Sequence, residues 1–132
     1  MYKRKKTFTT EVTKPQLTND DIIQKAINYI NCNYNQDLSR ETLAASIYLS
    51  PSHFSYLFKQ KTGTSFMDYL TTVRMQKSIE LLATNMRIND IAEKVGYQNR
   101  NRFIINFRQF TGYTPTEYRK NILAIEDSFY EK

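Results

Sequence analysis

The chain has 132 residues, which is enough for one domain or for two small modules that share an element. Nineteen Lys and Arg against 13 Asp and Glu give a net charge of +6, which attracts polyanions but does not by itself establish that one is bound. The 3 Gly and 3 Pro argue against an all-β fold, the single Cys32 excludes an internal disulfide, and no apolar run approaches the ~20 residues of a membrane span. We therefore expect an all-α, cytoplasmic protein with no membrane partner.

The segment 1–17, with a basic run at 3–6, has no apolar period and is predicted to form a flexible arm. The first helix is expected to begin after Thr18 or Asn19 and to end in the Asn-rich stretch 31–35. Its apolar residues follow helical spacing along one stripe: Ile22, Ile23, Ala26, Ile27 and Ile30. This stripe is the first part of the predicted core.

Two helices with clear start signals come next. Ser39 is expected to cap a short helix, and Ser50-Pro51 begins a second one, because Ser caps a helix and Pro fits its first position. The second helix is predicted to run over residues 51–62, with Gly63 ending it in the left-handed conformation.

A long helix is expected from its cap Ser65 to about Ala83. Its apolar residues change sides half-way: one face carries Phe66, Tyr69, Leu70 and Val73, and another carries Met75, Ser78, Ile79 and Leu82. A helix whose apolar stripe moves in this way contacts two cores in turn. We therefore expect it to join two modules.

The chain then returns to the earlier layout. Asn89 is expected to cap a short helix over 90–95, and Gly96 lies in the turn after it. A longer helix is predicted over about 99–111, and a Thr-Pro pair at 114–115 begins a last helix.

This similarity is an internal repeat. The strings LAASIYLS at 43–50 and LFKQKTG at 57–63 recur as IAEKVGYQ at 91–98 and NFRQFTG at 106–112. The second copy therefore carries one extra residue at the turn. A repeat of this length indicates a duplicated supersecondary unit, here a short helix, a turn and a longer basic and aromatic helix.

Such a unit has the layout of a helix-turn-helix. Two copies predict a sequence-specific protein that binds double-stranded DNA, with recognition helices at about 51–62 and 99–111 in two successive major grooves. We expect about seven helices, forming two helix-turn-helix modules joined by one long linker helix. The predicted division, in chain order, is a basic arm at 1–17, a first module at 18–64, the linker helix at 65–84, a second module at 85–121 and a tail at 122–132.

The strings LAASIYLSPSHFSYLFKQKTGTSFMDYL, IELL and INDIAEKVGYQNRNRFIINFRQFTGYTPTEYRK closely resemble the DNA-binding domain of AraC/XylS-type transcription regulators. The similarity extends from Ile22 to Lys120. It implies two helix-turn-helix modules on one long helix, operator DNA as the partner, and no catalysis, cofactor or metal. It also brings in one further candidate partner, the N-terminal effector and dimerisation domain of longer members. RNA polymerase is another candidate partner, because contact with a polymerase is compatible with DNA binding.

One residue departs from the family pattern. Tyr48 stands where the family usually has Gly and where the second copy has Gly96. A left-handed backbone is costly for Tyr, so we expect the turn of the first module to be adjusted.

The candidate DNA contacts face away from the apolar stripes of the two recognition helices. They are Ser52, His53, Ser55, Tyr56 and Lys59 in the first helix, and Arg100, Asn101, Arg102, Ile104, Ile105 and Arg108 in the second. The inward stripes are Phe54, Leu57 and Phe58, and Phe103, Phe107 and Phe110. By the resemblance, positions 52, 55 and 56 correspond to the family's main base-contacting positions.

These residue types differ in what they recognise. Arg100 and Asn101 suit paired hydrogen bonds to guanine and adenine, whereas Lys59 and Arg108 suit phosphates. Ile104 and Ile105 are adjacent, so at least one of them must be exposed. The exposed side chain would contact either a thymine methyl group or a partner domain. His53 fits either solvent and phosphate contact or base recognition.

The role of the arm stays open: it is either a linker remnant or a segment that grips DNA.

Two other functions are also considered. A nuclease or deaminase is disfavoured, because one His and one Cys do not make a metal site and the acidic residues are scattered. A helical protein-docking module would instead expose apolar residues, among them the Ile104-Ile105 and Phe129-Tyr130 pairs.

Overall fold

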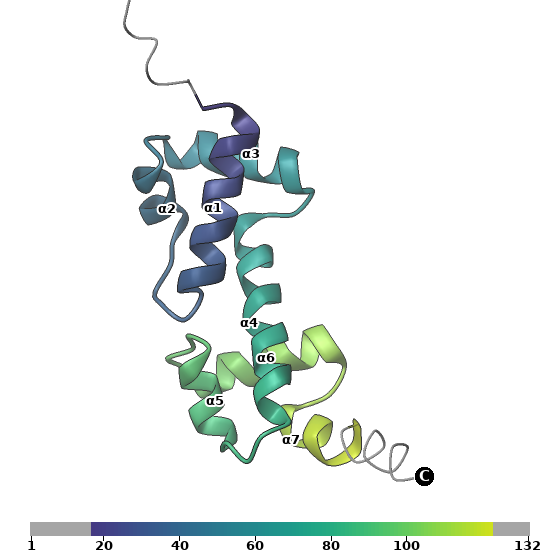
Figure 1. Cartoon of the computed structure of the whole chain (residues 1–132). Coiled ribbons are helices and arrows are strands. Elements are labelled where there is room, and N and C mark those ends of the chain that lie inside the picture. The colour runs from purple at the N-terminus through teal and green to yellow at the C-terminus, as the bar shows by residue number, and fades with distance from the viewer. Residues whose placement is uncertain (1–16, 123–132) are drawn as a thin grey trace, which may run out of the picture.

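The computed structural model describes residues 17–122, in which every regular element is helical (Figure 1). The helices are α1 (Asn19–Asn33), α2 (Arg40–Ser46), α3 (Pro51–Thr62), α4 (Phe66–Leu82), α5 (Ile88–Lys94), α6 (Arg100–Thr111) and α7 (Pro115–Glu117), and a π-helical turn (Tyr118–Ile122) comes after them. The prediction of an all-α fold with about seven helices is confirmed for these residues. The predicted arm, except Leu17, and the tail beyond Ile122 lie outside the described residues.

The molecule has two hydrophobic cores, one at each end of α4. In the first, the rings of Phe54, Phe58 and Phe66 pack with centroids 5.6 to 6.3 Å apart. In the second, Phe103 and Phe107 pack against Tyr97 and Tyr118 at 5.5 and 5.6 Å respectively. Figure 1 shows α4 passing from the upper group of helices into the lower one.

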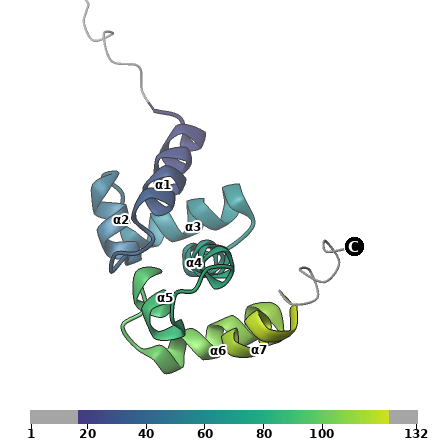
Figure 2. The ribbon, with the colours of Figure 1, turned by 60° about the horizontal axis from the view of Figure 1, so that its bottom comes forward.

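The two buried faces of α4 follow the predicted change of side. The first core buries Phe66, Leu70 and Val73, and the second buries Met75 and Leu82. Figure 2 looks nearly along α4 and shows α3 and α6 on opposite sides of it. The shared helix therefore carries one recognition helix on each side.

Capping side chains start most helices where the sequence predicts. The hydroxyl of Ser50 accepts from the His53 N–H at 3.1 Å, and Pro51 occupies the first turn. Asn99 caps α6 by accepting from the Arg102 N–H at 3.1 Å. Gly63 ends α3 with φ 81°, as expected.

The predicted cap of α5 is wrong. The helix begins at Ile88, so Asn89 lies inside its first turn, and Arg87 occupies the cap position without a side-chain hydrogen bond to the backbone. The start of the helix follows the internal repeat: Ile88 is the counterpart of Arg40, so Arg87 stands where Ser39 caps α2. Just before the helix, Arg119 donates to the carbonyl of Met86 at 2.6 Å.

The expected adjustment of the turn between α2 and α3 is limited to one backbone angle, since φ is 61° at Tyr48 and 107° at Gly96. The N–H groups of Tyr48 and Leu49 donate to Ala45 and Ala44 at 3.2 and 2.9 Å, and the turn after α5 makes the equivalent bonds. Tyr48 has φ 61° and keeps the left-handed backbone. Its side chain is 94% exposed, so no packing forces the turn to change.

One aromatic residue does not point inward as predicted. Phe110 is 42% exposed, although Phe103 and Phe107 on the same stripe are fully buried. Its equivalent in α3 is Lys61, which pairs with Asp20 of α1 at 3.0 Å at the surface. This position therefore lies beyond the edge of the core in both copies.

Candidate nucleic-acid interface

Each recognition helix is held by its inward face and leaves the other face open. In module 1, meaning the helices around the first core, α3 buries Phe54, Leu57 and Phe58 and packs against α2. In module 2, around the second core, α6 buries Phe103 and Phe107 and packs against α5. The outward faces are the surfaces that the sequence predicts for DNA.

Four of the five candidates on α3 lie in the open. Ser52, His53 and Lys59 are exposed, and Tyr56 is 65% exposed. Ser55 is half-buried instead. A shallow hollow on this face is lined by Ser55, Tyr56, Lys59 and Gln60.

The sequence analysis missed one neighbour of this face, Arg40. It is the first residue of α2, and its Nη1 donates to the Ser55 hydroxyl at 3.4 Å. Its Nε also donates to Glu41 at 3.1 Å, and the pKa of that carboxyl is lowered by a backbone hydrogen bond and by Arg40. A signal for Arg40 exists in the sequence, because Ser39 marks the start of the short helix and the two helices of a helix-turn-helix lie side by side.

The candidates on α6 fall into a charged group and an apolar pair. Arg100, Asn101, Arg102 and Arg108 are all exposed, as expected from the sequence. Ile105 is 51% exposed, whereas Ile104 is half-buried against the second core. The prediction that at least one of the two Ile side chains is exposed is confirmed.

A hydrogen bond fixes α6 from its inner side. Asn106 Nδ2 donates to the hydroxyl of Tyr97 at 2.9 Å, and Tyr97 is almost fully buried at the turn before α6. The orientation of the exposed face is thereby tied to the second core.

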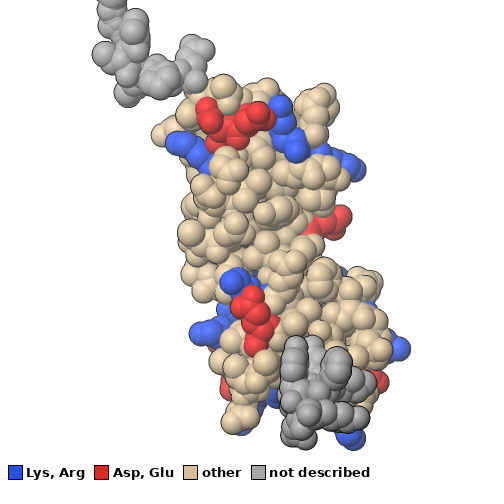
Figure 3. Space-filling view, turned by 45° about the vertical axis from the view of Figure 1, so that its right-hand side comes forward, with Lys and Arg blue, Asp and Glu red and all other residues tan. Residues whose placement is uncertain are grey.

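The charges favour an anion on both recognition helices. Neither α3 nor α6 contains an Asp or Glu, whereas α6 has three Arg. The face seen in Figure 3 carries basic and acidic side chains in both modules rather than one basic patch. The cations on the two recognition helices would attract a polyanion locally.

Two other kinds of site receive no support from the described part of the chain. Residues 17–122 hold no group of three or more His, Cys, Asp or Glu side chains that could bind a metal ion. Their helices are all too short or too polar to cross a membrane.

Comparison with known proteins decides the family. Residues 43–121, more than half of the chain, match the family model described as a helix-turn-helix domain. The C-terminal domain of AraT, a response regulator from Geobacillus stearothermophilus, is 39% identical, with a TM-score of 0.73 over 75% of this chain and 84% of that one. The chain belongs to the AraC/XylS-type transcription regulators.

Two further proteins are similar to this chain in fold or in sequence. The DNA-binding domain of AdpA, solved with a target DNA, is 24% identical and shares the fold, with a TM-score of 0.74 over 77% of this chain and 93% of that one. The lactose operon transcription activator of Staphylococcus xylosus is 36% identical over 115 residues, which are 86% of this chain and 40% of the relative. The chain thus spans less than half the length of that curated relative.

Proposed function

We propose that the chain binds double-stranded operator DNA in the cytoplasm, with α3 and α6 in two successive major grooves. The observation that carries the proposal is the pair of exposed, acid-free helices backed by aromatic cores on opposite sides of α4. The 17 residues of α4 make a rod of about 26 Å, the same order as the ~34 Å repeat of the major groove. Membership of a family of DNA-binding regulators supports the same proposal.

The proposed contacts divide by chemistry between bases and phosphates. In α6, Arg100 and Asn101 recognise guanine and adenine, and Ile105 contacts a thymine methyl group. Ile104 is proposed in a supporting role, because half of its side chain packs inward. Arg102 binds the backbone beside them.

The face of α3 offers weaker hydrogen-bonding groups, so module 1 depends more on DNA backbone and shape. Ser52, Ser55 and Tyr56 contact base edges, with the apolar hollow beside Tyr56 suited to a methyl group. His53 and Lys59 bind phosphates, as Arg108 does in α6. Arg40 is proposed as a further phosphate contact, because its hydrogen bond to Ser55 places its guanidinium group beside the exposed face of α3.

The test is selection of bound duplexes from a random pool at ~150 mM salt, followed by sequencing. We expect two short motifs about one helical turn (~10 base pairs) apart. Arg100→Ala should relax the preference at one or two positions of one motif, where a good paired contact discriminates by ~1–3 kcal/mol. Lys25→Ala removes an exposed charge from α1 and serves as the control.

Two results would contradict the proposal. A pool that emerges without enriched sequences would remove sequence-specific binding and move the protein-docking alternative to the front. Equal weakening of all sequences by Arg100→Ala would reassign Arg100 from bases to phosphates.

The lactose operon relative is named as an activator, and we propose activation for this chain as well. RNA polymerase, and an N-terminal effector and dimerisation domain such as longer members carry, are the proposed partners. A promoter fusion with the selected operator should gain transcription when the chain is expressed. Loss of transcription would indicate a repressor instead.

A further inference from the structure

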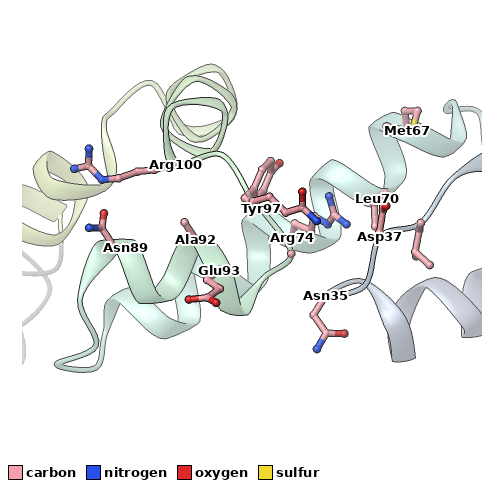
Figure 4. Close-up of a pocket in the computed structure, with 13 residues that line it drawn as sticks. Asn35, Asp37, Met67, Leu70, Arg74, Asn89, Ala92, Glu93, Tyr97 and Arg100 are labelled. Atoms are coloured by element: carbon pink, nitrogen blue, oxygen red, sulfur yellow. The ribbon is translucent and has the colours of Figure 1, made fainter.

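The two modules meet at one narrow place beside α4, which we call the seam: Tyr34, Arg74, Gly96 and Tyr97. Apart from α4 itself, no helix of one module packs extensively against a helix of the other in the described residues. Figure 4 shows Arg74 in the pocket at this place, between Tyr97 of module 2 and Asp37 of module 1. The seam is therefore the main contact, besides the shared helix α4, that can fix the angle between the modules.

Arg74 contacts both modules with one side chain. Its Nε donates to the carbonyl of Tyr34 and its Nη2 to the carbonyl of Gln36, each at 2.8 Å, in the loop between α1 and α2. Its guanidinium carbon lies 5.3 Å from the ring centroid of Tyr97, in the core of module 2. One planar cation thus joins the backbone of module 1 to an aromatic ring of module 2.

The neighbours of Arg74 leave it little freedom. A Cβ at Gly96 would lie 2.8 Å from the Tyr34 carbonyl oxygen and 3.0 Å from Arg74 Nε, so the two chain segments approach too closely for a side chain there. The Tyr34 side chain itself packs against both cores. Burial lowers the pKa of Arg74, because desolvation disfavours its charge.

The rest of the boundary is open. A half-open cavity of about 570 Å³ lies beside Arg74, lined by residues of both modules that include Asn35 and Glu93. If the seam were broken, the packing of both cores on α4 would be the main remaining restraint on the angle between the modules.

A second arginine shows what is particular to Arg74. Arg119 donates to the carbonyls of Leu82 and Thr84, each at 3.0 Å. In the internal repeat these carbonyls are the counterparts of those of Tyr34 and Gln36, so both modules have the equivalent loop bound by an arginine. Arg119 stays within module 2, whereas Arg74 reaches across the seam.

We propose that Arg74 is a positioning residue: it fixes the angle between α3 and α6 and thereby the half-site spacing that the chain accepts. The inference rests on the proposed function for its DNA consequence. With a fixed angle, binding of one module presents the other at high effective concentration to a half-site at one spacing only. With a loose seam, that concentration is spread over several spacings.

The first experiment measures the angle without DNA. Nitroxide labels at Lys25→Cys and Lys94→Cys, in a Cys32→Ser background, report the distance between the modules by pulsed electron resonance. Arg74→Met should broaden the distance distribution, while Arg119→Met should destabilise module 2 and leave the width unchanged. Equal widths in the Arg74 variant and the parent would overturn the proposal.

Arg74→Lys keeps the charge but cannot span both carbonyls, and it serves if Arg74→Met fails to fold. Circular dichroism melting checks the folding of each variant. The Lys variant is expected to broaden the distribution as well, and an unchanged width would overturn the proposal in the same way.

The second experiment uses the selected operator, single half-sites, and operators with one base pair added or removed between the half-sites. The parent chain should lose about 10-fold or more in affinity when the spacing changes. Arg74→Met should bind the half-sites like the parent and lose most of this spacing preference, and Arg119→Met should keep it. A parent that binds no sequence specifically defeats the proposed function, whereas an unchanged spacing preference in Arg74→Met defeats this inference alone.

Discussion

Tyr48 holds a backbone conformation that glycine adopts freely and other residues do not. Its φ of 61° costs a residue with a Cβ about 1–2 kcal/mol. The side chain is almost wholly exposed, so no burial of apolar surface offsets this cost. The first turn is therefore a point of stored strain.

Tyr48→Gly is expected to raise the free energy of unfolding by about 1 kcal/mol, or the Tm by about 5 °C, because the strain is relieved. Thermal and urea unfolding measure the change. Tyr48→Ala keeps a Cβ and should stay near the parent. An unchanged Tyr48→Gly would mean that the extra backbone entropy of glycine in the unfolded chain cancels the relief.

Gly96, at the equivalent turn, is constrained by contacts as well as by its backbone. Gly96→Ala should lower the free energy of unfolding by about 2–4 kcal/mol, because φ is 107° and the new Cβ would overlap the Tyr34 carbonyl oxygen. Gly63→Ala is the matched control: φ is 81° but nothing lies within 4 Å of its Cβ, so only the backbone cost of about 1 kcal/mol is expected. Urea denaturation measures the free energy of unfolding of both variants. Equal losses in the two would show that the residues around Gly96 shift enough to accommodate a methyl group.

At the scale of the elements, α5 stands apart from its neighbours because its cap position has no capping side chain. Arg87→Ser would put a hydroxyl three residues before Asp90, the spacing of a capping box. We expect a gain of about 0.5–1 kcal/mol in the free energy of unfolding. Arg87→Ala removes the same charge without supplying an acceptor, and a gain equal to that of the Ser variant would rule out capping as the cause.

Local signals in the sequence predict most of the helices well. Ser50-Pro51 and Gly63 define both ends of α3 to the residue, because caps act on the backbone immediately beside them. The two stripes of α4 predict its two cores for the same reason, since helical spacing alone decides which side chains share a face.

The remaining features are not given by local signals alone. Asn89 resembles a cap, but α5 begins at Ile88, the counterpart of the first residue of α2 in the internal repeat. Phe110 fits the inward stripe of α6, but the core ends before it. Arg74 lies in no motif of the sequence analysis, and only its hydrogen bonds to carbonyls of the distant loop after α1 reveal it.

At the scale of the whole molecule, the affinity for DNA should divide into a sequence-blind and a sequence-dependent part. Lys59→Gln and Arg108→Gln should weaken binding to all duplexes alike, and each should reduce the slope of log affinity against log salt by about 1. Fluorescence anisotropy over a salt series measures both quantities. Lys25→Gln, on α1, should leave the slope unchanged, and a loss confined to one operator position would mark Lys59 or Arg108 as a base contact.

The two buried faces of α4 also restrict how the distance between the recognition helices can vary. Each residue added to a helix lengthens it by about 1.5 Å and turns the rest of the chain by about 100°. One residue inserted next to Arg74, between the two buried faces, would rotate module 2 about the axis of α4 by about 100° and shift it along that axis by only about 1.5 Å. An insertion of about seven residues would move it by about 10.5 Å and nearly restore the angle. The operator period of such a regulator can therefore change only in discrete increments of whole helical turns, never gradually.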